Sequence, residues 1–236
     1  MSAGEPLRPA WAYRPGPDVA PAPPPELVAA QRIALAAAEA ACRAARPGMT
    51  ELELERVASD AMLAGGATGV WTITNIGVGE GSRTCFPTDP PGDRALAAED
   101  VAVVDVHPIS PGGAWGDCTR TALVGDGTEA RDALAELADI HAATLEACRP
   151  GMPASELFGG CLQRIDAAGF ELLDQLANIG HSLTAGAAYL HAFIDASNDT
   201  PMWGAWAIEP FVGRGALGVK LEDLVWFGRD GCEVLR

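Results

Sequence analysis

Apolar residues, interrupted by single charged ones, dominate residues 27–45, a segment rich in strong helix formers. The pattern predicts one helix that ends at Pro47-Gly48, because proline and glycine do not continue a helix. Thr50 begins a second predicted helix, since Glu53 three residues later completes a capping box in which each side chain accepts a hydrogen bond from the other residue's backbone amide. This helix is expected to end near Gly65-Gly66.

The same order of elements returns further along the chain. Residues 133–149 predict a helix that ends at a second Pro-Gly pair, and Ser155 opens another helix that closes at Gly169. The sequence Arg46-Pro47-Gly48-Met49 recurs as Arg149-Pro150-Gly151-Met152. A common type of helix stop could occur twice, but the flanking helices match as well. We therefore interpret the repeat as one α+β half used twice.

Five apolar segments predict strands. Residues 101–104 form a continuous apolar run, which is typical of a strand covered on both faces. Together with the helices, these segments predict an α+β fold in which helices pack on a mainly antiparallel sheet built from two similar halves. The segments are residues 70–73, 101–106, 119–124, 206–212 and 219–227.

Residues 1–25 differ in composition from the rest, since they hold eight of the 18 prolines. Proline lacks a backbone donor and favours extended polyproline geometry, so we expect an arm outside the core. Trp11 and Tyr13 are candidates for pinning the arm to a surface, and a free tail is the alternative. Residues 26–236 are predicted to form a single domain.

The net charge of −16, from 32 acidic and 16 basic side chains, narrows the choice of partners. A negative surface without a Lys/Arg cluster repels phosphate, so we expect no nucleic acid partner, and cations are the natural partners instead. The longest apolar stretch, residues 33–45, contains charges and is too short to cross a bilayer, so no membrane contact is expected. The 48% share of hydrophobic residues excludes global disorder.

The cysteines and the first residues indicate a cellular compartment. The start of the chain shows no basic segment followed by an apolar run, so no secretory signal is expected. Six cysteines are scattered without CxxC or CxxH spacing, which argues against a cysteine zinc site. We therefore expect a cytoplasmic protein with reduced thiols.

Carboxylates stand next to the predicted strands, where an unpaired charge beside apolar residues costs free energy. Asp105 closes one strand and Asp117 precedes the next, so an antiparallel pair of strands would bring them together. His181, Glu209 and Glu222 stand at the end or in the middle of other apolar segments. Four carboxylates and one imidazole form a hard, oxygen-rich set that suits one or two divalent ions such as manganese, iron, cobalt or zinc.

These residues also carry a resemblance to a known family. The chain from Leu27 to Arg236 resembles the pita-bread (M24) metallopeptidases, which include methionine aminopeptidase, aminopeptidase P, prolidase and creatinase. The resemblance implies the pita-bread fold, with two duplicated α+β halves around a curved antiparallel sheet, and makes residues 26–236 the catalytic domain. The matching motifs are Asp105-x-His107-Pro108, Asp117-x-Thr119-Arg120-Thr121, Gly180-His181, Ile208-Glu209-Pro210 and residues 218–225.

The same resemblance implies roles for individual residues. Asp105 would bind one ion through both oxygens, and Glu209 would accept a proton from a metal-bound water. A bridged pair of ions lowers the pKa of bound water from about 15.7 toward about 7 and polarises a carbonyl. The implied metal ligands are Asp105, Asp117, His181, Glu209 and Glu222, of which Asp117 and Glu222 would bridge two ions.

Two family histidines that hold the substrate have no direct counterpart here. Thr88 stands where the family usually has a histidine after a Phe-Pro-like segment, and threonine cannot exchange a proton near pH 7 as imidazole does. The second histidine usually follows about seven residues after the Gly-His motif, whereas the candidate His191 lies ten residues after His181. His191 either reaches the site through a small insertion, as a catalytic residue, or is a surface or packing histidine.

Two further residues depart from the family pattern near the metal ligands. Lys220 replaces an arginine that often precedes the last ligand, which keeps the charge but loses the bidentate fork. His107 stands where many relatives have glycine; it either faces the ions or packs against Pro108, and packing is favoured. With Thr88, these are the candidate substrate-binding residues.

An intact set of metal ligands beside altered substrate residues leaves three functions open. The first is a metal-dependent hydrolase that cuts a peptide or amide bond in the manner of Xaa-Pro peptidases. The second is a small-molecule tailoring enzyme on the same scaffold, either a creatinase-like C–N hydrolase, a lyase or an iron-dependent oxidase. The third, less favoured, is a non-catalytic binding protein. A small peptide or small molecule is the expected partner, and a homodimer is a candidate assembly.

Overall fold

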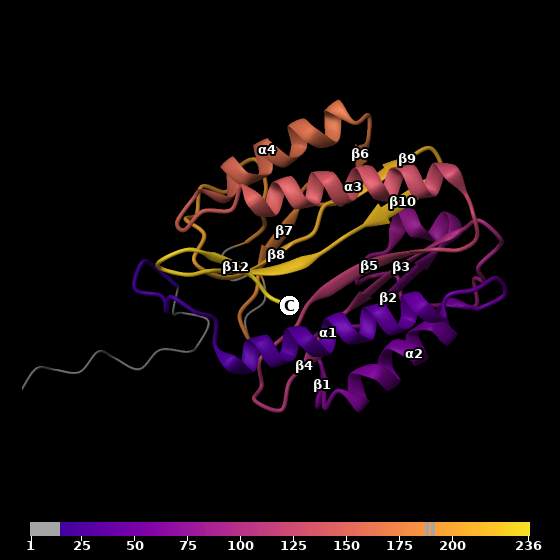
Figure 1. Ribbon diagram of the computed structural model, residues 1–236, viewed down its shortest axis with the longest axis horizontal. Helices are drawn as coiled ribbons and strands as arrows, with labels where there is room; N and C mark the ends of the chain where they lie inside the picture. Colours follow the sequence, from indigo (N-terminus) through magenta and orange to yellow (C-terminus); the bar gives the residue numbers. More distant parts are fainter. Residues whose placement is uncertain (1–14, 187–188, 190–191) are drawn as a thin grey trace, which may run out of the picture.

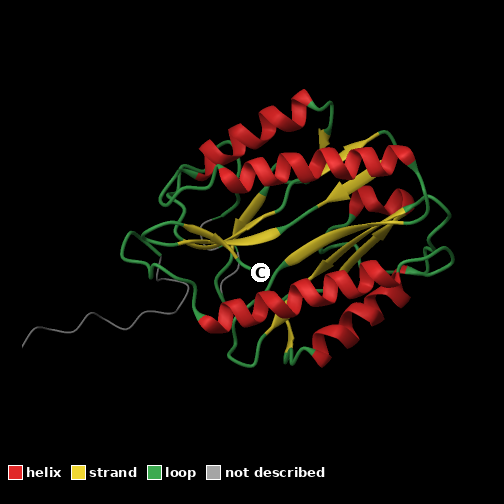
Figure 2. Ribbon diagram, viewed as in Figure 1, coloured by secondary structure: helices red, strands yellow, loops and turns green. Residues whose placement is uncertain are grey.

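Helices lie on the outside of the protein, and the strands fill the space between them (Figure 1, Figure 2). The computed structural model describes residues 15–186, 189 and 192–236. Trp11, Tyr13 and His191, three residues singled out in the sequence, lie outside the described residues. Within the described part of the chain, no helix has the length and apolar run that crossing a bilayer requires.

The long helices form two pairs on opposite sides of the strands (Figure 1). The first pair is α1 (Pro25–Ala44) and α2 (Glu51–Ala64), and the second is α3 (Thr128–Glu146) and α4 (Ala154–Ala167). All four confirm the helices predicted from the sequence. α3 begins earlier than expected, because residues 128–132 form a mainly polar first turn that gives no hydrophobic signal.

Small side chains let α1 approach the rest of the first half closely. Ala30, Ala34, Ala37 and Ala41 are fully buried on the inner face of α1, which contacts α2, β3 (Val101–Val106) and β5 (Cys118–Leu123). The capping box predicted at the start of α2 is present: the backbone amide of Glu53 donates to Thr50 Oγ1 at 3.2 Å, and that of Thr50 donates to Glu53 Oε2 at 2.9 Å.

The repeated Arg-Pro-Gly-Met sequence forms the same turn in both halves. Gly48 and Gly151 adopt left-handed φ values of 88° and 69°, which favour glycine. The amide of Gly48 donates to Leu96 O at 2.8 Å, and the amide of Gly151 donates to Met202 O at 3.0 Å. The agreement of conformation and partner positions supports duplication over a chance repeat.

The first half contains the sheet β2–β3–β5, with β2 at Asn75–Val78. All six residues of β3 are buried, which confirms the prediction of a strand covered on both faces. The strand predicted at residues 70–73 is wrong: only Gly69–Val70 forms a strand (β1), which is exposed and pairs with β4 (Pro108–Ile109). β2 was not predicted, because a four-residue segment with a glycine in its middle has little strand signal.

The second half contains a four-stranded sheet and a three-stranded sheet, in the orders β12–β11–β8–β7 and β10–β9–β6. All strand pairs of the described residues are antiparallel. The strands are β6 (Glu171–Leu172), β7 (Gly180–Ser182), β8 (Gly204–Ile208), β9 (Phe211–Arg214), β10 (Leu217–Lys220), β11 (Asp223–Phe227) and β12 (Cys232–Val234).

The two long strands predicted in the second half are each broken in the structure. Residues 206–212 divide into β8 and β9 around Glu209-Pro210, and residues 219–227 divide into β10 and β11 around Leu221-Glu222. Pro210 lacks the backbone N–H that a continuous ladder needs. Both breaks therefore fall at glutamates singled out as metal ligands.

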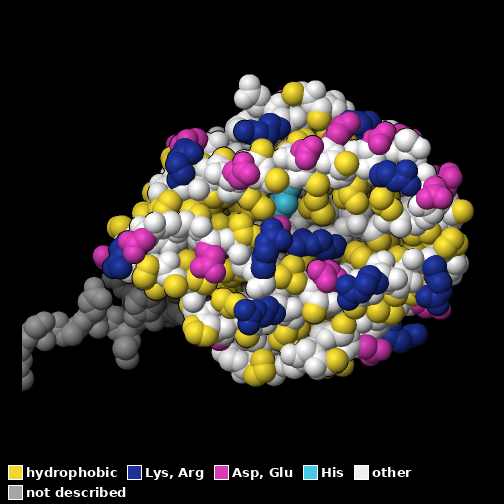
Figure 3. Space-filling view, in the orientation of Figure 1, with side chains coloured by type: hydrophobic (Ala, Val, Ile, Leu, Met, Phe, Trp, Pro, Cys, Tyr) yellow, Lys and Arg dark blue, Asp and Glu magenta, His cyan; other side chains and the backbone are white. Residues whose placement is uncertain are grey.

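Each half buries its own hydrophobic cluster. One cluster runs from Ile33 to Val124 and includes Leu54 and Val104; the other runs from Ala133 to Phe227. Residues 15–24 lie against the second half, where Trp226 Nε1 donates to Ala20 O at 3.1 Å. On the face in Figure 3, arginine side chains gather between the two helix pairs, so this face is not uniformly acidic.

Candidate metal centre

Asp105 enters the interior from the central strand of the first half. It lies near the end of β3, opposite Asn75 of β2 and Thr119 of β5 in the register, and is 3% exposed. His107 follows two residues later and therefore points to the same side of the strand. The polar end of an apolar strand thus carries an aspartate and a histidine side by side.

Gln31 of α1 holds Asp117 in place through its backbone. Gln31 Nε2 donates to Asp117 O at 2.7 Å, and the amide of Asp117 donates to Gln31 Oε1 at 3.0 Å. Gly116 allows this contact, because a Cβ at that position would lie 2.4 Å from Ala30 O. The two hydrogen bonds fix the backbone of Asp117 just before β5, and so fix the point from which its carboxylate extends.

The second half supplies His181 and Glu209. Gly180 precedes His181 with a φ of 146°, and a Cβ there would lie 2.1 Å from Ala207 O, so the close pairing of β7 with β8 requires glycine. His181 Nε2 lies 3.5 Å from Asp117 Oδ2 and 3.4 Å from Glu209 Oε1. These contacts join carboxylates of both halves around one imidazole.

The tautomer of His181 follows from its other nitrogen. His181 Nδ1 lies 3.0 Å from Ser182 O, a carbonyl that can only accept, so Nδ1 carries the proton and donates. Nε2 is then left with a lone pair that faces the carboxylates. Burial lowers the pKa of His181, which favours the neutral form that binds metals.

The loop between β10 and β11 brings in Glu222. Its backbone amide donates to Thr119 O at 3.1 Å, and its Oε2 accepts from Thr119 Oγ1 at 2.8 Å. Arg120 donates to Glu222 O and pairs with Asp223 Oδ1 at 2.7 Å, while His141 of α3 lies 3.0 Å from Asp223 Oδ2. Glu222 is therefore positioned by β5 of the opposite half.

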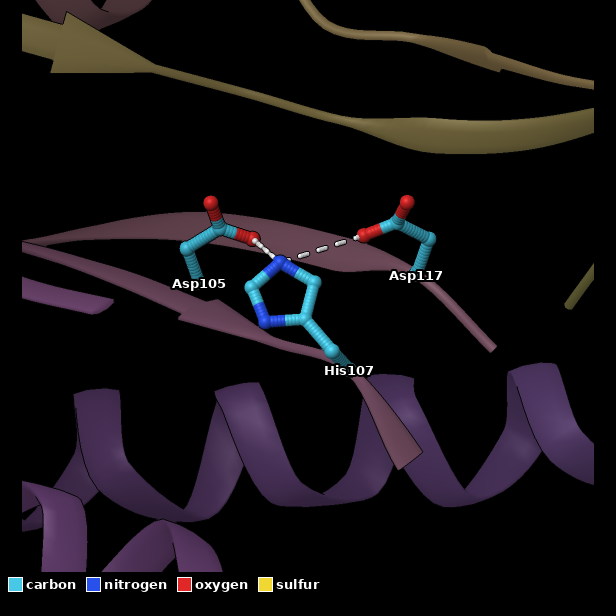
Figure 4. Close-up of side chains that lie close together, drawn as sticks. All are labelled: Asp105, His107 and Asp117. Atoms are coloured by element: carbon cyan, nitrogen blue, oxygen red, sulfur yellow. Dashed lines mark ion pairs between the residues drawn. The ribbon is translucent and has the colours of Figure 1, made fainter. Parts of the chain in front are cut away.

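His107 corrects the preferred sequence interpretation, because it does not simply pack against Pro108. Its Nε2 lies 3.1 Å from Asp105 Oδ1 and 3.6 Å from Asp117 Oδ1, between the two aspartates (Figure 4). The edge of Trp71 contacts the ring, with centroids 5.0 Å apart. The two-residue spacing from Asp105 was the signal that could have predicted this orientation.

Lys220, the only lysine in the sequence, lies among these carboxylates, which we call the metal-ligand cluster. Its Nζ is 3.1 Å from Asp105 Oδ2 and 2.6 Å from Glu209 Oε2, and the residue is 7% exposed. Burial alone would lower the pKa of Lys220, but the carboxylates of Asp105 and Glu209 raise it well above its usual value. The side chain is thus a fixed cation among the carboxylates.

The pKa values of the buried carboxyl groups shift in two opposite directions. Burial alone would raise the pKa of Asp105, but Lys220 and His107 hold it well below its usual range. Burial raises the pKa of Asp117 and of Glu222, and neighbouring carboxylates raise both further. The protein's own groups therefore do not compensate the charge of Asp117 and Glu222.

Several buried oxygen atoms lack a hydrogen-bond partner within the described residues: Asp105 Oδ1, Asp117 Oδ2 and Glu222 Oε1. Asp105, His107 and Asp117 present ligand atoms within 4.8 Å of one another, and so do Asp117, His181 and Glu222. Buried, unpaired carboxylate oxygens around imidazole nitrogens are the donor set expected of a divalent metal site. The residues present therefore fit such an ion.

The cluster opens into a cavity of about 370 Å³. Trp71 and Tyr189 are among the aromatic residues that line it. Trp71 stacks on Trp115 with centroids 5.2 Å apart, and the Tyr189 ring centroid lies 4.5 Å from that of His181. Thr88 lines the cavity and is exposed, as is expected of a residue that meets a substrate. A cavity of this size and lining suits a small molecule or short peptide.

The structure thus brings together seven of the residues singled out in the sequence and places Thr88 at the cavity they face. The seven are Asp105, His107, Asp117, His181, Glu209, Lys220 and Glu222. Sequence reasoning missed Gln31, Trp71 and Asn75. Gln31 lies 86 positions from its partner, and no local pattern marks such a contact.

Comparison with known proteins agrees with this arrangement. The model of metallopeptidase family M24 matches residues 26–228. The probable dipeptidase PepE of Mycobacterium tuberculosis strain H37Rv is 28% identical over 199 residues, which cover 79% of this chain and 49% of that protein. The chain therefore spans about half the length of this curated relative.

Solved structures share the fold. Prolidase from Pyrococcus furiosus aligns with a TM-score of 0.79 and 25% identity, covering 89% of this chain and 62% of that one. Dipeptidase PepE from Mycobacterium ulcerans aligns with a TM-score of 0.77 and 25% identity, covering 89% and 57%. These neighbours confirm the predicted α+β pita-bread fold.

Proposed function

Because the chain belongs to metallopeptidase family M24, we propose that it is a metal-dependent hydrolase that cleaves a peptide or amide bond of a small substrate, as Xaa-Pro peptidases do. One observation carries the proposal. Buried carboxylate oxygens of Asp105, Asp117 and Glu222 have no hydrogen-bond partners of their own in the described residues, and Asp105 and Asp117 line a cavity open to a substrate. The prolidase and dipeptidase names of the similar proteins support the same reaction class.

The proposed ligands are the five residues implied by the sequence. Asp105 and Asp117 come from the first half, and His181, Glu209 and Glu222 come from the second. When bound, a divalent ion supplies an activated water at neutral pH and polarises the carbonyl of the substrate. Manganese, iron, cobalt and zinc all suit this donor set.

Glu209 is the proposed proton acceptor. Its side chain is 15% exposed, more than those of Asp105 and Asp117, and it lines the cavity where a substrate would lie. Lys220 holds one oxygen of Glu209 in an ion pair, which orients the side chain and leaves the other oxygen toward His181. His191, outside the described residues, remains the proposed second catalytic residue.

The cavity wall would hold the substrate. Thr88 offers a hydroxyl that can donate to a carbonyl oxygen but cannot shuttle a proton near pH 7. The aromatic side chains Trp71, Tyr189 and Phe193 provide flat apolar contacts for a ring such as that of proline. Binding would therefore depend on apolar contact and on the metal-ligand cluster.

Activity assays with matched variants test this proposal. Metal-loaded protein should release amino acids from Xaa-Pro dipeptides faster than from the matching Xaa-Ala dipeptides. Asp105→Asn should abolish turnover and weaken metal binding together, whereas Asp139→Asn, at an exposed position on α3, should change neither. Metal bound at full occupancy without hydrolysis of any peptide or amide would reject the proposal.

A second candidate, a small-molecule tailoring enzyme on this scaffold, is favoured by the altered surroundings of the ligands. Thr88 replaces an expected histidine, and Lys220 and His107 lie among the carboxylates. Amidines and small amides assayed under air and under nitrogen distinguish a creatinase-like hydrolase or lyase from an iron-dependent oxidase, since only the oxidase consumes oxygen. Metal binding without any turnover would indicate a binding protein.

The cytoplasmic location, the homodimer and the lack of a nucleic acid partner stay predictions from the sequence. Elemental analysis of the purified protein identifies the metal. Sedimentation equilibrium measures the oligomeric state, and cell fractionation measures the location.

A further inference from the structure

We propose that His107 is itself a metal ligand, so that His107 and His181 place one imidazole on each of two ions bridged by Asp117. The inference rests on the proposed function, because it concerns ions in the same centre. It changes the composition of the site, since the family resemblance implies only one imidazole among five ligands.

The arrangement of Asp117 carries the proposal. Its Oδ1 lies 3.6 Å from His107 Nε2, and its Oδ2 lies 3.5 Å from His181 Nε2. The two oxygens of one carboxylate therefore face two different imidazoles, one from each half of the chain. A bridging carboxylate presents one oxygen to each of two ions in the same manner.

The separations of these atoms fit ligands that share an ion. Two atoms that each lie about 2.1 Å from one ion are about 3.0 Å apart at octahedral angles and about 3.4 Å apart at tetrahedral angles. His107 Nε2 is 3.1 Å from Asp105 Oδ1 and 3.6 Å from Asp117 Oδ1 (Figure 4). His181 Nε2 lies at similar distances, 3.5 Å and 3.4 Å, from Asp117 Oδ2 and Glu209 Oε1.

Lys220 explains why the ion beside Asp105 needs another ligand. Its ammonium lies 3.1 Å from Asp105 Oδ2, and Asn75 Nδ2 donates to the same oxygen at 3.5 Å. Only Asp105 Oδ1 is then free of hydrogen bonds to the described residues, so the bidentate binding implied by the resemblance is reduced to one oxygen. His107 Nε2, on the same side of the strand, supplies the missing donor atom.

The position of the His107 ring is fixed by its surroundings. The residue is 4% exposed, and the edge contact with Trp71 orients the ring toward the aspartates. Trp71 is in turn held by its indole N–H, which donates to Gly116 O at 2.9 Å next to Asp117. Packing therefore holds the ring where it faces the aspartates, since its Nδ1 is buried without a hydrogen-bond partner in the described residues.

An imidazole ligand on each of the two ions changes which metal the site prefers. Nitrogen ligands favour zinc, cobalt and iron over magnesium and manganese, which prefer all-oxygen sites. The competing arrangement is a protonated His107 that serves as a counter-cation between Asp105 and Asp117 and binds no metal. The two arrangements predict opposite effects of removing the ring.

Calorimetric titration of zinc into the metal-free protein tests the proposal without any assay of activity. The wild type should bind two ions per chain. His107→Asn should retain one ion with affinity close to that of the wild type and bind the other more than about 100-fold more weakly, beyond the usual effect of losing a supporting hydrogen bond. Asp139→Asn, at an exposed position on α3, is the matched control and should bind both ions normally.

Unchanged or tighter binding of both ions by His107→Asn would overturn the proposal and identify a counter-cation. A wild type that binds no ion would overturn the proposed function as well, so the two failures are distinguishable. Proton NMR of the dicobalt wild type gives a readout that does not depend on the folding of a variant. The sequence holds four histidines, and the rings of both His107 and His181 should show paramagnetically shifted signals; a His107 ring without such shifts would contradict ligation.

Discussion

The ammonium of Lys220 lies 2.6 Å from the carboxylate of Glu209, and Lys220 is the only lysine in the sequence. The same ammonium also pairs with Asp105, so one cation serves a carboxylate from each half. A buried ammonium between two carboxylates compensates charge that would otherwise be unpaired in the interior. The Lys220–Glu209 ion pair therefore holds the proposed proton acceptor in place and also stabilises the folded site.

Removing this cation should destabilise the metal-free protein. We expect Lys220→Met to lower the free energy of unfolding at pH 7 by about 3 kcal/mol, because two buried carboxylates lose their partner. Lys220→Arg keeps the charge and should lose less. Urea unfolding with a chelator measures both variants, and excess zinc should restore part of the loss in Lys220→Met. Equal stability of Lys220→Met and the wild type would contradict this account.

Gln31 should act on the metal site through the backbone of Asp117. Gln31→Leu removes both hydrogen bonds and leaves two buried backbone groups unpaired, at a cost of about 2–4 kcal/mol in unfolding free energy. Zinc affinity should fall about tenfold, as it does when a ligand loses its support. Arg32→Ala, at the exposed neighbouring position on α1, is the control for both measurements. A variant that loses stability but binds zinc normally would refute the positioning role.

The stability of the metal-free protein should depend on pH in two opposite directions. The raised pKa values of Asp117 and Glu222 mean that, above about pH 4, the folded state holds protons that the unfolded state has released, so stability falls as pH rises toward the folded pKa values. The lowered pKa of Asp105 acts below about pH 4, where stability is lost as pH falls.

Metal binding should therefore release protons and strengthen as pH rises. Zinc titrations in buffers of different ionisation enthalpy count the protons released, and urea unfolding from pH 3 to pH 8 with a chelator measures the stability profile. Asp117→Asn removes one titrating group and should flatten the decline above about pH 4. Zinc affinity that is independent of pH would show that the carboxyl groups are already ionised.

Thr88 can be tested by restoring an imidazole. If the reaction is peptide hydrolysis, Thr88→His should raise kcat for an Xaa-Pro dipeptide at least about tenfold, since a positioned general acid or base typically contributes more than this. Thr88→Val should instead raise KM, because it removes the hydroxyl that donates to the substrate carbonyl. Steady-state kinetics of the three proteins separates the two effects. No gain with Thr88→His would favour the tailoring reactions.

Local patterns were sufficient to predict much of the fold and most of the site. The capping box at Thr50 and the apolar run of β3 specify their elements within a few residues. Asp105 and Asp117 could be paired because a short connection between antiparallel strands brings their ends together. The positions of His181, Glu209 and Glu222 beside apolar segments made them candidates, and the family resemblance added the role of each as a metal ligand.

The remaining features depend on contacts between distant parts of the chain. The strands around Glu209-Pro210 and Leu221-Glu222 read as continuous apolar segments, and only the folded structure shows that they break to turn each glutamate inward. Lys220 was expected near the substrate, but its pairing with Asp105 joins residues 115 positions apart. The secondary-structure propensity of a residue gives no information about a partner so far along the chain.

The two hydrophobic clusters, one in each half, have a consequence for how the protein unfolds. Each half buries an apolar interior of its own, and the ligand groups divide between them, with Asp105 and Asp117 on one side and His181, Glu209 and Glu222 on the other. An ion held by both sides binds only when both are folded, which couples their unfolding. Leu27 and Ala30 of the first half already pack with Leu224 of the second, so the ion adds to an existing coupling. The metal-loaded chain should therefore melt at a higher temperature than the same chain after chelation.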